Sequence, residues 1–130
     1  AFFRVCGDSP LLLPFMFDKA ASIYKQGQYD LVTNVFPRTF PKGMSIELIK
    51  TRTFIDIEKK TKNEKDREHI TQYFYNKKKE FKIHNIECKR TLDPTLNLAL
   101  DNPDDLIRLQ EWDNKRNKDY DELFPIIETT

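Results

Sequence analysis

The sequence predicts an α/β domain whose sheet is mostly parallel, on three observations. Short apolar segments typical of strands alternate with segments whose apolar residues recur every three or four positions, as in helices. Clusters of Gly, Pro, Asp and Asn separate these segments, as turns require. Ten Phe, five Tyr and one Trp supply large side chains for a core, and 130 residues suffice for about one domain.

The first half of the chain is expected to hold three strands and one helix. Residues 2–6 are nearly all apolar, which favours a strand covered on both faces. Residues 11–26 show helical spacing of apolar side chains, and Gly27 ends that helix. Strands are predicted over residues 29–35 and 44–49, and two prolines keep the loop between them irregular.

The second half continues the alternation. The polar residues 58–65 indicate a helix end and a loop, and Asp66 is interpreted as the N-cap of a helix over residues 67–76. Short strands are expected over residues 82–88 and 96–100. A helix then begins at the sequence Asn-Pro-Asp-Asp, where a capping residue precedes Pro and acidic side chains follow at the positive end of the helix dipole.

Two predicted strands run into an aspartate followed by a proline and a helix. Strand 2–6 leads through Gly7 to Asp8, and strand 96–100 leads directly to Asp101. In α/β sheets such positions lie at the carboxyl edge, where ligands bind. Two carboxylates there could share one Mg²⁺, which completes its shell with water and phosphate oxygens. The same residues could instead only favour the helix dipoles, and spacing leaves both interpretations open.

Composition argues against several functional classes. A formal net charge of +1 does not fit a dedicated nucleic-acid binder, although aromatic and lysine residues adjoin at 73–79. We interpret those aromatic residues as core and the lysines as a solvated helix end. No apolar run approaches the ~20 residues that span a bilayer, and Arg4 and Asp8 interrupt any signal-peptide pattern, so a cytoplasmic protein is expected.

The cysteines and histidines do not form a recognisable site in the sequence. Cys6 and Cys88 lie in apolar, strand-like segments without metal-ligand spacing, so buried reduced thiols are expected, with a disulfide as the alternative. His69 is interpreted as a hydrogen-bonded pocket residue in preference to a catalytic base, and His84 as structural or exposed.

Four segments resemble, in order, motifs of the cytidylyltransferases that activate sugars. This family contains spore-coat polysaccharide proteins and synthetases of CMP-activated acidic sugars. Residues 4–11 (RVCGDSPL) resemble its RxxGDxPL signature, and residues 29–43 resemble its central segment. Residues 67–71 (REHIT) and 100–106 (LDNPDDL) are similar to its REHVT and VDTPEDL motifs. The resemblance covers residues 2 to 110 and implies a Rossmann-like nucleotide-diphospho-sugar transferase fold.

The resemblance implies a Mg²⁺-dependent enzyme that transfers CMP from CTP to a sugar, expected to be acidic, and releases pyrophosphate. Such a reaction would serve surface polysaccharide biosynthesis. Asp8 and Asp101 match the family's two catalytic, metal-binding aspartates. Arg38 and Lys42 lie in the segment that faces the sugar, where an arginine suits a carboxylate or phosphate. The resemblance also suggests a homodimer.

Two further positions are carried over with less defined roles. Glu68 and His69 match the REHVT motif, and the resemblance implies that they shape the sugar pocket. The sequence departs from the family pattern elsewhere, with Asn102 in place of Thr and Ser45 where an acidic residue is frequent. These departures bear on which sugar is used more than on the fold.

The chain is expected to be a single partial domain, the C-terminal part of a cytidylyltransferase. The family begins with a strand and a basic, glycine-containing loop that holds CTP, and three glycines cannot build such a loop here. The N-terminal half is therefore expected to be missing and these 130 residues to be inactive alone. The alternative is a non-catalytic, truncated module that binds a sugar or a protein partner.

Overall fold

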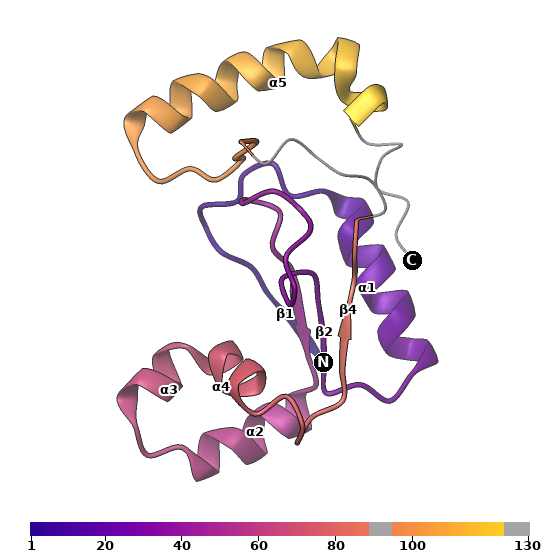
Figure 1. The fold of residues 1–130 in the computed structure, drawn as a ribbon, viewed down its shortest axis with the longest axis vertical. Helices are drawn as coiled ribbons and strands as arrows, with labels where there is room; N and C mark the ends of the chain where they lie inside the picture. The colour runs from indigo at the N-terminus through magenta and orange to yellow at the C-terminus, as the bar shows by residue number, and fades with distance from the viewer. Residues whose placement is uncertain (89–94, 124–130) are drawn as a thin grey trace.

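The computed structural model describes the backbone of residues 1–88 and 95–123. Nine helices and strands occur in this part of the chain (Figure 1). In order they are β1 (Phe2–Arg4), α1 (Pro14–Gln26), β2 (Leu31–Thr33), β3 (Glu47–Ile49), α2 (Thr51–Lys60), α3 (Glu64–Glu68), α4 (Ile70–Asn76), β4 (Ile83–Asn85) and α5 (Pro103–Leu123). The expected α/β alternation is therefore confirmed.

The four strands form one mixed sheet in the order β1-β3-β2-β4. β3 pairs antiparallel with both β1 and β2, whereas β2 and β4 pair in parallel. β1, β2 and β4 thus point the same way, and their carboxyl ends share one edge. A mostly parallel sheet was expected, and β1, β2 and β4 do run in the same direction. The expectation is wrong for the hydrogen-bonded strand pairs, because two of the three pairs, β1–β3 and β2–β3, are antiparallel. The reason is that β3 follows β2 through a loop without a crossover helix, so the chain returns antiparallel.

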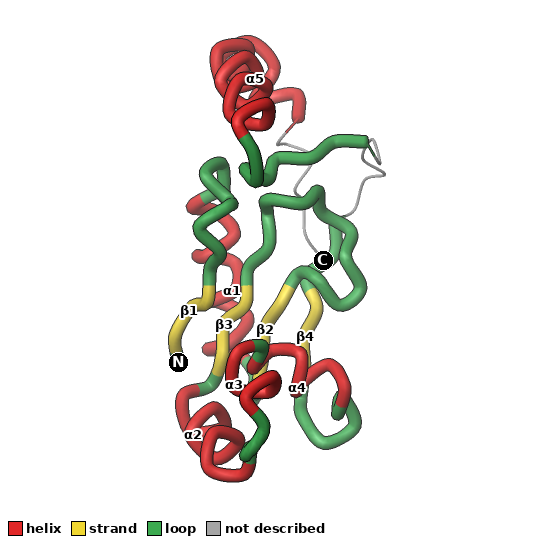
Figure 2. Tube along the Cα trace, turned by 90° about the vertical axis from the view of Figure 1, so that its left-hand side faces the viewer, coloured by secondary structure: helices red, strands yellow, loops and turns green. Residues whose placement is uncertain are grey.

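The strand register divides the apolar side chains between the two faces of the sheet. Leu31 and Ile49 are paired residues on one face, and their neighbours Val32 and Leu48 are paired on the other. Helix α1 and the buried Leu109 of α5 pack in the core that contains Val32 and Leu48. Helices α2 and α4 pack in the core that contains Leu31 and Ile49. The sheet therefore lies between two layers of helices (Figure 2).

Three predicted elements differ from the structure. The helix expected over residues 67–76 is broken at His69, which has φ −119° and ψ 57° and separates α3 from α4. The cap of α3 is Asn63, whose side chain accepts a hydrogen bond from the Lys65 amide, and not Asp66. Residues 96–100 form no continuous strand, because their one ladder contact is an isolated parallel bridge between Asn97 and Lys42.

The expectation of two buried cysteines is wrong for Cys6. Cys6 is exposed and Cys88 is half-buried. The apolar segment 2–6 was expected to be covered on both faces, whereas β1 ends at Arg4 and is an edge strand. Residues beyond that end leave the sheet and are not covered by it.

One glycine sets the approach between the β2–β3 loop and the chain that leads into α5. Gly43 has φ +89°, in the left-handed region that favours glycine. A Cβ atom there would lie 2.3 Å from the carbonyl carbon of Leu98. The loop and residues 97–99 can meet this closely because position 43 carries no side chain.

We expect Gly43→Ala to destabilise the chain by more than about 1 kcal/mol, since it combines backbone strain with a clash against backbone atoms. Denaturant unfolding measures the change. Gly7→Ala is the matched control, because a Cβ at Gly7 would meet no atom within 4 Å. Equal unfolding free energies for the two variants would contradict the role assigned to Gly43.

Candidate functional site

Two aspartate-bearing segments meet at the carboxyl edge of the sheet. The amide of Leu100 donates a hydrogen bond to the carbonyl oxygen of Asp8, at 2.8 Å. Asp8 follows β1, and Asp101 is the residue after Leu100. Asp8 is half-buried and Asp101 is exposed. The structure thus brings together two acidic residues that are far apart in the sequence.

The start of α5 holds the backbone around Asp101. The side chain of Asn102 accepts a hydrogen bond from the Asp105 amide at 3.0 Å. In return, the Oδ2 atom of Asp105 accepts from the amides of Asp101 and Asn102 at 3.0 and 3.1 Å. This reciprocal arrangement is a capping box, and it confirms the helix start predicted at Asn102 and Pro103.

Arg108, one turn further along α5, binds the residues that precede Asp101. Its guanidinium forms an ion pair with Asp105 at 3.0 Å and donates hydrogen bonds to the carbonyl oxygens of Asn97 and Ala99. The amide of Asp101 lowers the pKa of Asp105, and the hydrogen bond from Arg108 lowers it further. The carboxylate of Asp105 is thereby occupied in holding backbone groups.

The carboxylates of Asp8 and Asp101 remain available for a cation. Asp8 accepts one hydrogen bond, from the Ser9 hydroxyl at 3.3 Å, and neither residue forms an ion pair within residues 1–88 and 95–114, whose side chains the structure describes. No cluster of three or more His, Cys, Asp or Glu side chains suited to a metal occurs in those ranges. Two carboxylates fit Mg²⁺, which usually binds one or two and takes its other ligands from water and phosphates.

The loop between β2 and β3 is held at its base by a buried asparagine. Asn34 donates to the carbonyl oxygen of Met44 at 2.7 Å and accepts from the amide of Ile46 at 2.9 Å. Both polar groups of this side chain are therefore satisfied inside the core, as burial requires. The two ends of the loop are tied to each other by one residue.

The same loop is hydrogen-bonded to β4 and to the residues that precede Asp101. Asn85 accepts from the amide of Phe36 at 2.9 Å and donates to the carbonyl oxygen of Pro37 at 3.0 Å, next to a cis Phe36–Pro37 peptide. The carbonyl oxygen of Lys42 accepts from the amide of Leu98 at 2.8 Å. The loop and the chain before Asp101 therefore share a backbone contact.

Arg38 and Lys42 are both exposed on this loop. The Nη1 atom of Arg38 donates to the Ser45 hydroxyl at 3.0 Å. In the described part of the chain, no carboxylate forms an ion pair with either residue. The loop thus presents uncompensated positive charge beside the segment that carries Asp101.

A polar network that sequence reasoning missed lies across the last residues of the strands. Glu47 is buried in the middle of the sheet edge, with Arg4 and Thr33 as its register partners. Its Oε1 atom accepts from Arg4 at 2.8 Å, and its Oε2 atom accepts from the Tyr75 hydroxyl at 2.6 Å. An acidic residue inside an apolar strand was the available signal, because a buried charge requires partners.

Tyr75 connects this network to α4. Its hydroxyl lies 2.9 Å from the Thr33 hydroxyl, and its ring stacks on Phe36 with centroids 4.7 Å apart. Burial raises the pKa of the Tyr75 hydroxyl, and the negative charge of Glu47 raises it further. The hydroxyl therefore stays protonated and donates a hydrogen bond to the Glu47 carboxylate.

Glu68 and His69 are exposed and lie at the junction of α3 and α4. Those helices occupy the opposite end of Figure 1 from α5, whose first turn follows Asp101. No described contact joins either residue to Asp8, Asp101 or the loop of Arg38. The structure therefore does not bring these two predicted residues to the others.

His84 packs away from this site. Its ring meets the Tyr29 ring edge-on, with centroids 5.2 Å apart, and within the described residues its Nε2 atom is buried without a hydrogen-bond partner. Of the two interpretations given for His84, structural or exposed, this packing favours the structural one.

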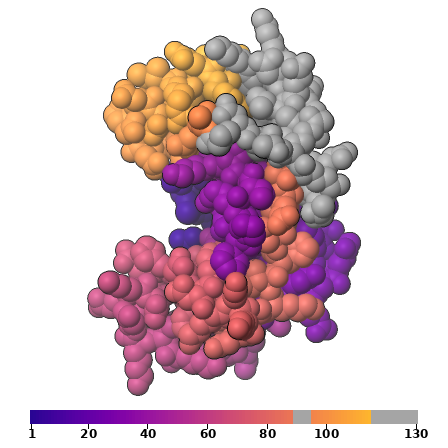
Figure 3. Space-filling view, in the orientation of Figure 1, coloured from indigo at the N-terminus to yellow at the C-terminus, as the bar shows by residue number. Residues whose placement is uncertain are grey.

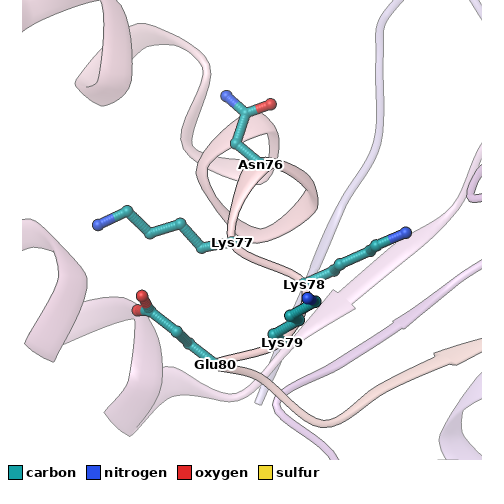
Figure 4. A pocket seen from close by; sticks show the side chains of 5 residues that line it. All are labelled: Asn76, Lys77, Lys78, Lys79 and Glu80. Carbon is teal, nitrogen blue, oxygen red and sulfur yellow. The ribbon is translucent and has the colours of Figure 1, made fainter.

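The surface of the described residues is hollowed beside α5 and carries a pocket at the end of α4. Figure 3 shows the surface hollowed between α5 and helices α2–α4, with the first, indigo residues of the chain visible at the base. A separate pocket of about 270 Å³ is lined by Asn76, Lys77, Lys78, Lys79 and Glu80. Figure 4 shows Lys77 and Lys78 pointing to opposite sides, so these cations do not converge on one ligand.

We expect the start of α5 to loosen at acid pH. Asp105 has a native pKa below its ordinary value of 3.8, so its contribution to stability is complete above that pH and is lost as pH falls through the lowered pKa. A ¹³C titration of the Asp105 carboxyl should give a midpoint below 3.8, and amide exchange at Asp101 should rise over the same range.

In Asp105→Asn, exchange at the Asp101 amide should be fast already at neutral pH and should not depend on this titration. A midpoint at or above 3.8 in the unsubstituted chain would contradict the assignment.

No family model and no curated protein matches the chain. The fold is similar to the solved structure of a cytidylyltransferase from Leptospira borgpetersenii serovar Hardjo-bovis (strain JB197), with TM-score 0.73 and 25% sequence identity. The match covers 88% of this chain and 56% of that one, so the chain spans little more than half of that protein's length. Among the described helices, none is long and apolar enough to cross a membrane. The similarity to this solved structure shows that the chain has a cytidylyltransferase-like α/β fold.

Proposed function

We propose that the chain is the metal- and sugar-binding part of a nucleotidyltransferase that moves CMP from CTP to a sugar. The observation that carries this is the hydrogen bond between Leu100 and Asp8, which brings Asp8 and Asp101 together at the carboxyl edge. The likeness in fold to a cytidylyltransferase supports it, as do the four motifs of the sequence. The finer proposal, from the motifs, is a sugar of surface polysaccharide biosynthesis, activated in the cytoplasm.

In this proposal Asp8 and Asp101 hold Mg²⁺ with their free carboxylates. The metal would neutralise charge on the triphosphate and orient the pyrophosphate leaving group. The contacts of Asp105 and Arg108 with the neighbouring amides and carbonyls hold the backbone around Asp101 before substrate arrives. CTP itself would bind chiefly to a part of the enzyme beyond these residues.

The loop of Arg38 and Lys42 would receive the sugar. Both cations lack a carboxylate partner among the described residues, and Asn34 and Asn85 limit the movement of the loop. A charged group on the sugar, such as a carboxylate, would pair with the planar guanidinium of Arg38. Glu68, His69 and a homodimer stay sequence predictions.

We expect Asp8→Asn and Asp101→Asn each to lower CMP transfer by the complete enzyme at least about 100-fold, because each removes a charged metal ligand. Calorimetry should show weaker Mg²⁺ binding by both variants, with unchanged unfolding temperatures. Asp104→Asn is the control, since Asp104 is an exposed aspartate in the first turn of α5, close to Asp101 in the sequence. Near-normal turnover in either variant would overturn the metal assignment.

We expect Arg38→Ala to raise the KM for an acidic sugar about tenfold or more while leaving the KM for CTP unchanged. Ser45→Asp should have the same effect with Arg38 intact, because the new carboxylate would sit beside its guanidinium. Ser45→Asn, which is neutral, is the control. An unchanged sugar KM in Arg38→Ala would place this residue outside the sugar site.

A further inference from the structure

We propose that Glu47 and Tyr75 are positioning residues that hold the metal-side and sugar-side segments in one arrangement. The proposal rests on the proposed function above and deepens it. Neither residue is expected to touch a substrate. Each acts through the groups that it binds, and these groups belong to β1, β2 and α4, which are distant in the sequence.

Arg4 connects Glu47 to the metal-side segment, which carries Asp8. This residue ends β1, the strand that leads to Asp8, and its guanidinium pairs with the Oε1 atom of Glu47 at 2.8 Å. The Glu47 side chain is only 8% exposed and that of Arg4 is 35% exposed, so water screens this pair in part and from the Arg4 side. The end of β1, and with it the start of the Asp8 segment, is therefore held against β3.

Tyr75 connects Glu47 to the sugar-side segment, which is the loop that carries Arg38. The Tyr75 hydroxyl donates to the Oε2 atom of Glu47, so the Thr33 hydroxyl must be the donor in its 2.9 Å contact with Tyr75. Thr33 in turn accepts from the amide of Val35 at 3.4 Å. Together with the stacking of the Tyr75 ring on Phe36, this fixes the first residues of the loop that carries Arg38.

These contacts form one series with a single proton arrangement. The direction runs from the Val35 amide through Thr33 and Tyr75 to the Glu47 carboxylate, and Arg4 occupies the second carboxylate oxygen. Hydrogen bonds in such a series polarise one another. Removal of one member should therefore affect the loop at the far end. The exposed pair of Arg67 and Glu58, by contrast, joins only α3 to α2.

Hydrogen exchange on the folded chain tests the coupling without any need for activity. Tyr75→Phe keeps the ring that stacks on Phe36 and removes only the hydroxyl. We expect exchange at the amides of Val35 and Phe36 to become about tenfold faster in this variant, as loss of a hydrogen bond to a charged group predicts. Tyr73→Phe is the matched control on the same helix, because among the described residues the Tyr73 hydroxyl accepts a hydrogen bond from the exposed Lys77 and has no other side-chain partner.

Glu47→Gln tests the connection to the metal-side segment, because the amide cannot carry the charge that pairs with Arg4. We expect faster exchange at Val35 and also at Leu100, whose amide binds the carbonyl oxygen of Asp8. Should this variant fail to fold, Tyr75→Phe still decides the proposal, since it leaves the ion pair of Glu47 and Arg4 in place.

Kinetics of the complete enzyme test the positioning role. We expect Tyr75→Phe to raise the KM for the sugar about tenfold and to leave the KM for CTP within about twofold, a split that general destabilisation would not produce. Loop exchange equal in Tyr75→Phe and Tyr73→Phe overturns the positioning proposal, whatever the activity. So does an unchanged sugar KM. Absence of CMP transfer by the unsubstituted complete enzyme, with loop exchange altered as expected, overturns the proposed function instead.

Discussion

The reversed strand β3 is the element on which the rest of the structure depends. It pairs with β1 on one side and β2 on the other, and so it sets the distance and register between two strands that run in the same direction. Because β1, β2 and β4 then end at one edge, the segments that follow them are delivered to one place. The register also puts Glu47 between Arg4 and Thr33, where a single carboxylate can bind groups from both neighbours.

Beyond the strand ends, polar side chains replace regular secondary structure. Loop amides and carbonyls near the core still need partners, and asparagine and aspartate side chains supply many of them. Asn34 closes the β2–β3 loop, Asn85 joins it to β4, and Asp105 binds the amides before α5. These residues are occupied in holding backbone, whereas the carboxylates of Asp8 and Asp101 and the guanidinium of Arg38 keep capacity for a ligand. That division separates the supporting residues from those proposed to act on substrates.

The site has opposite charges on its two sides although the chain is nearly neutral overall. The aspartates would attract a cation, and the cation a polyphosphate, while the adjoining loop would attract an anionic sugar. The contact between Lys42 and Leu98 joins the two sides through backbone. Glu47 joins them a second time, because its buried carboxylate binds the half-buried side chains of Arg4 and Tyr75. Two such connections suit a reaction in which a metal-bound phosphate and a sugar hydroxyl must meet in one orientation.

The sequence by itself determined what depends on neighbouring residues. It predicted the alternation of strands and helices and the helix start at Asn102 and Pro103, because periodicity and capping are local properties. Only the tertiary structure decided the reversed direction of β3, the exposure of Cys6, the break at His69 and the network around Glu47. Each of these depends on which distant segment packs alongside. Local propensity does not contain that information, because pairing partners and burial are set by contacts between residues far apart in the chain.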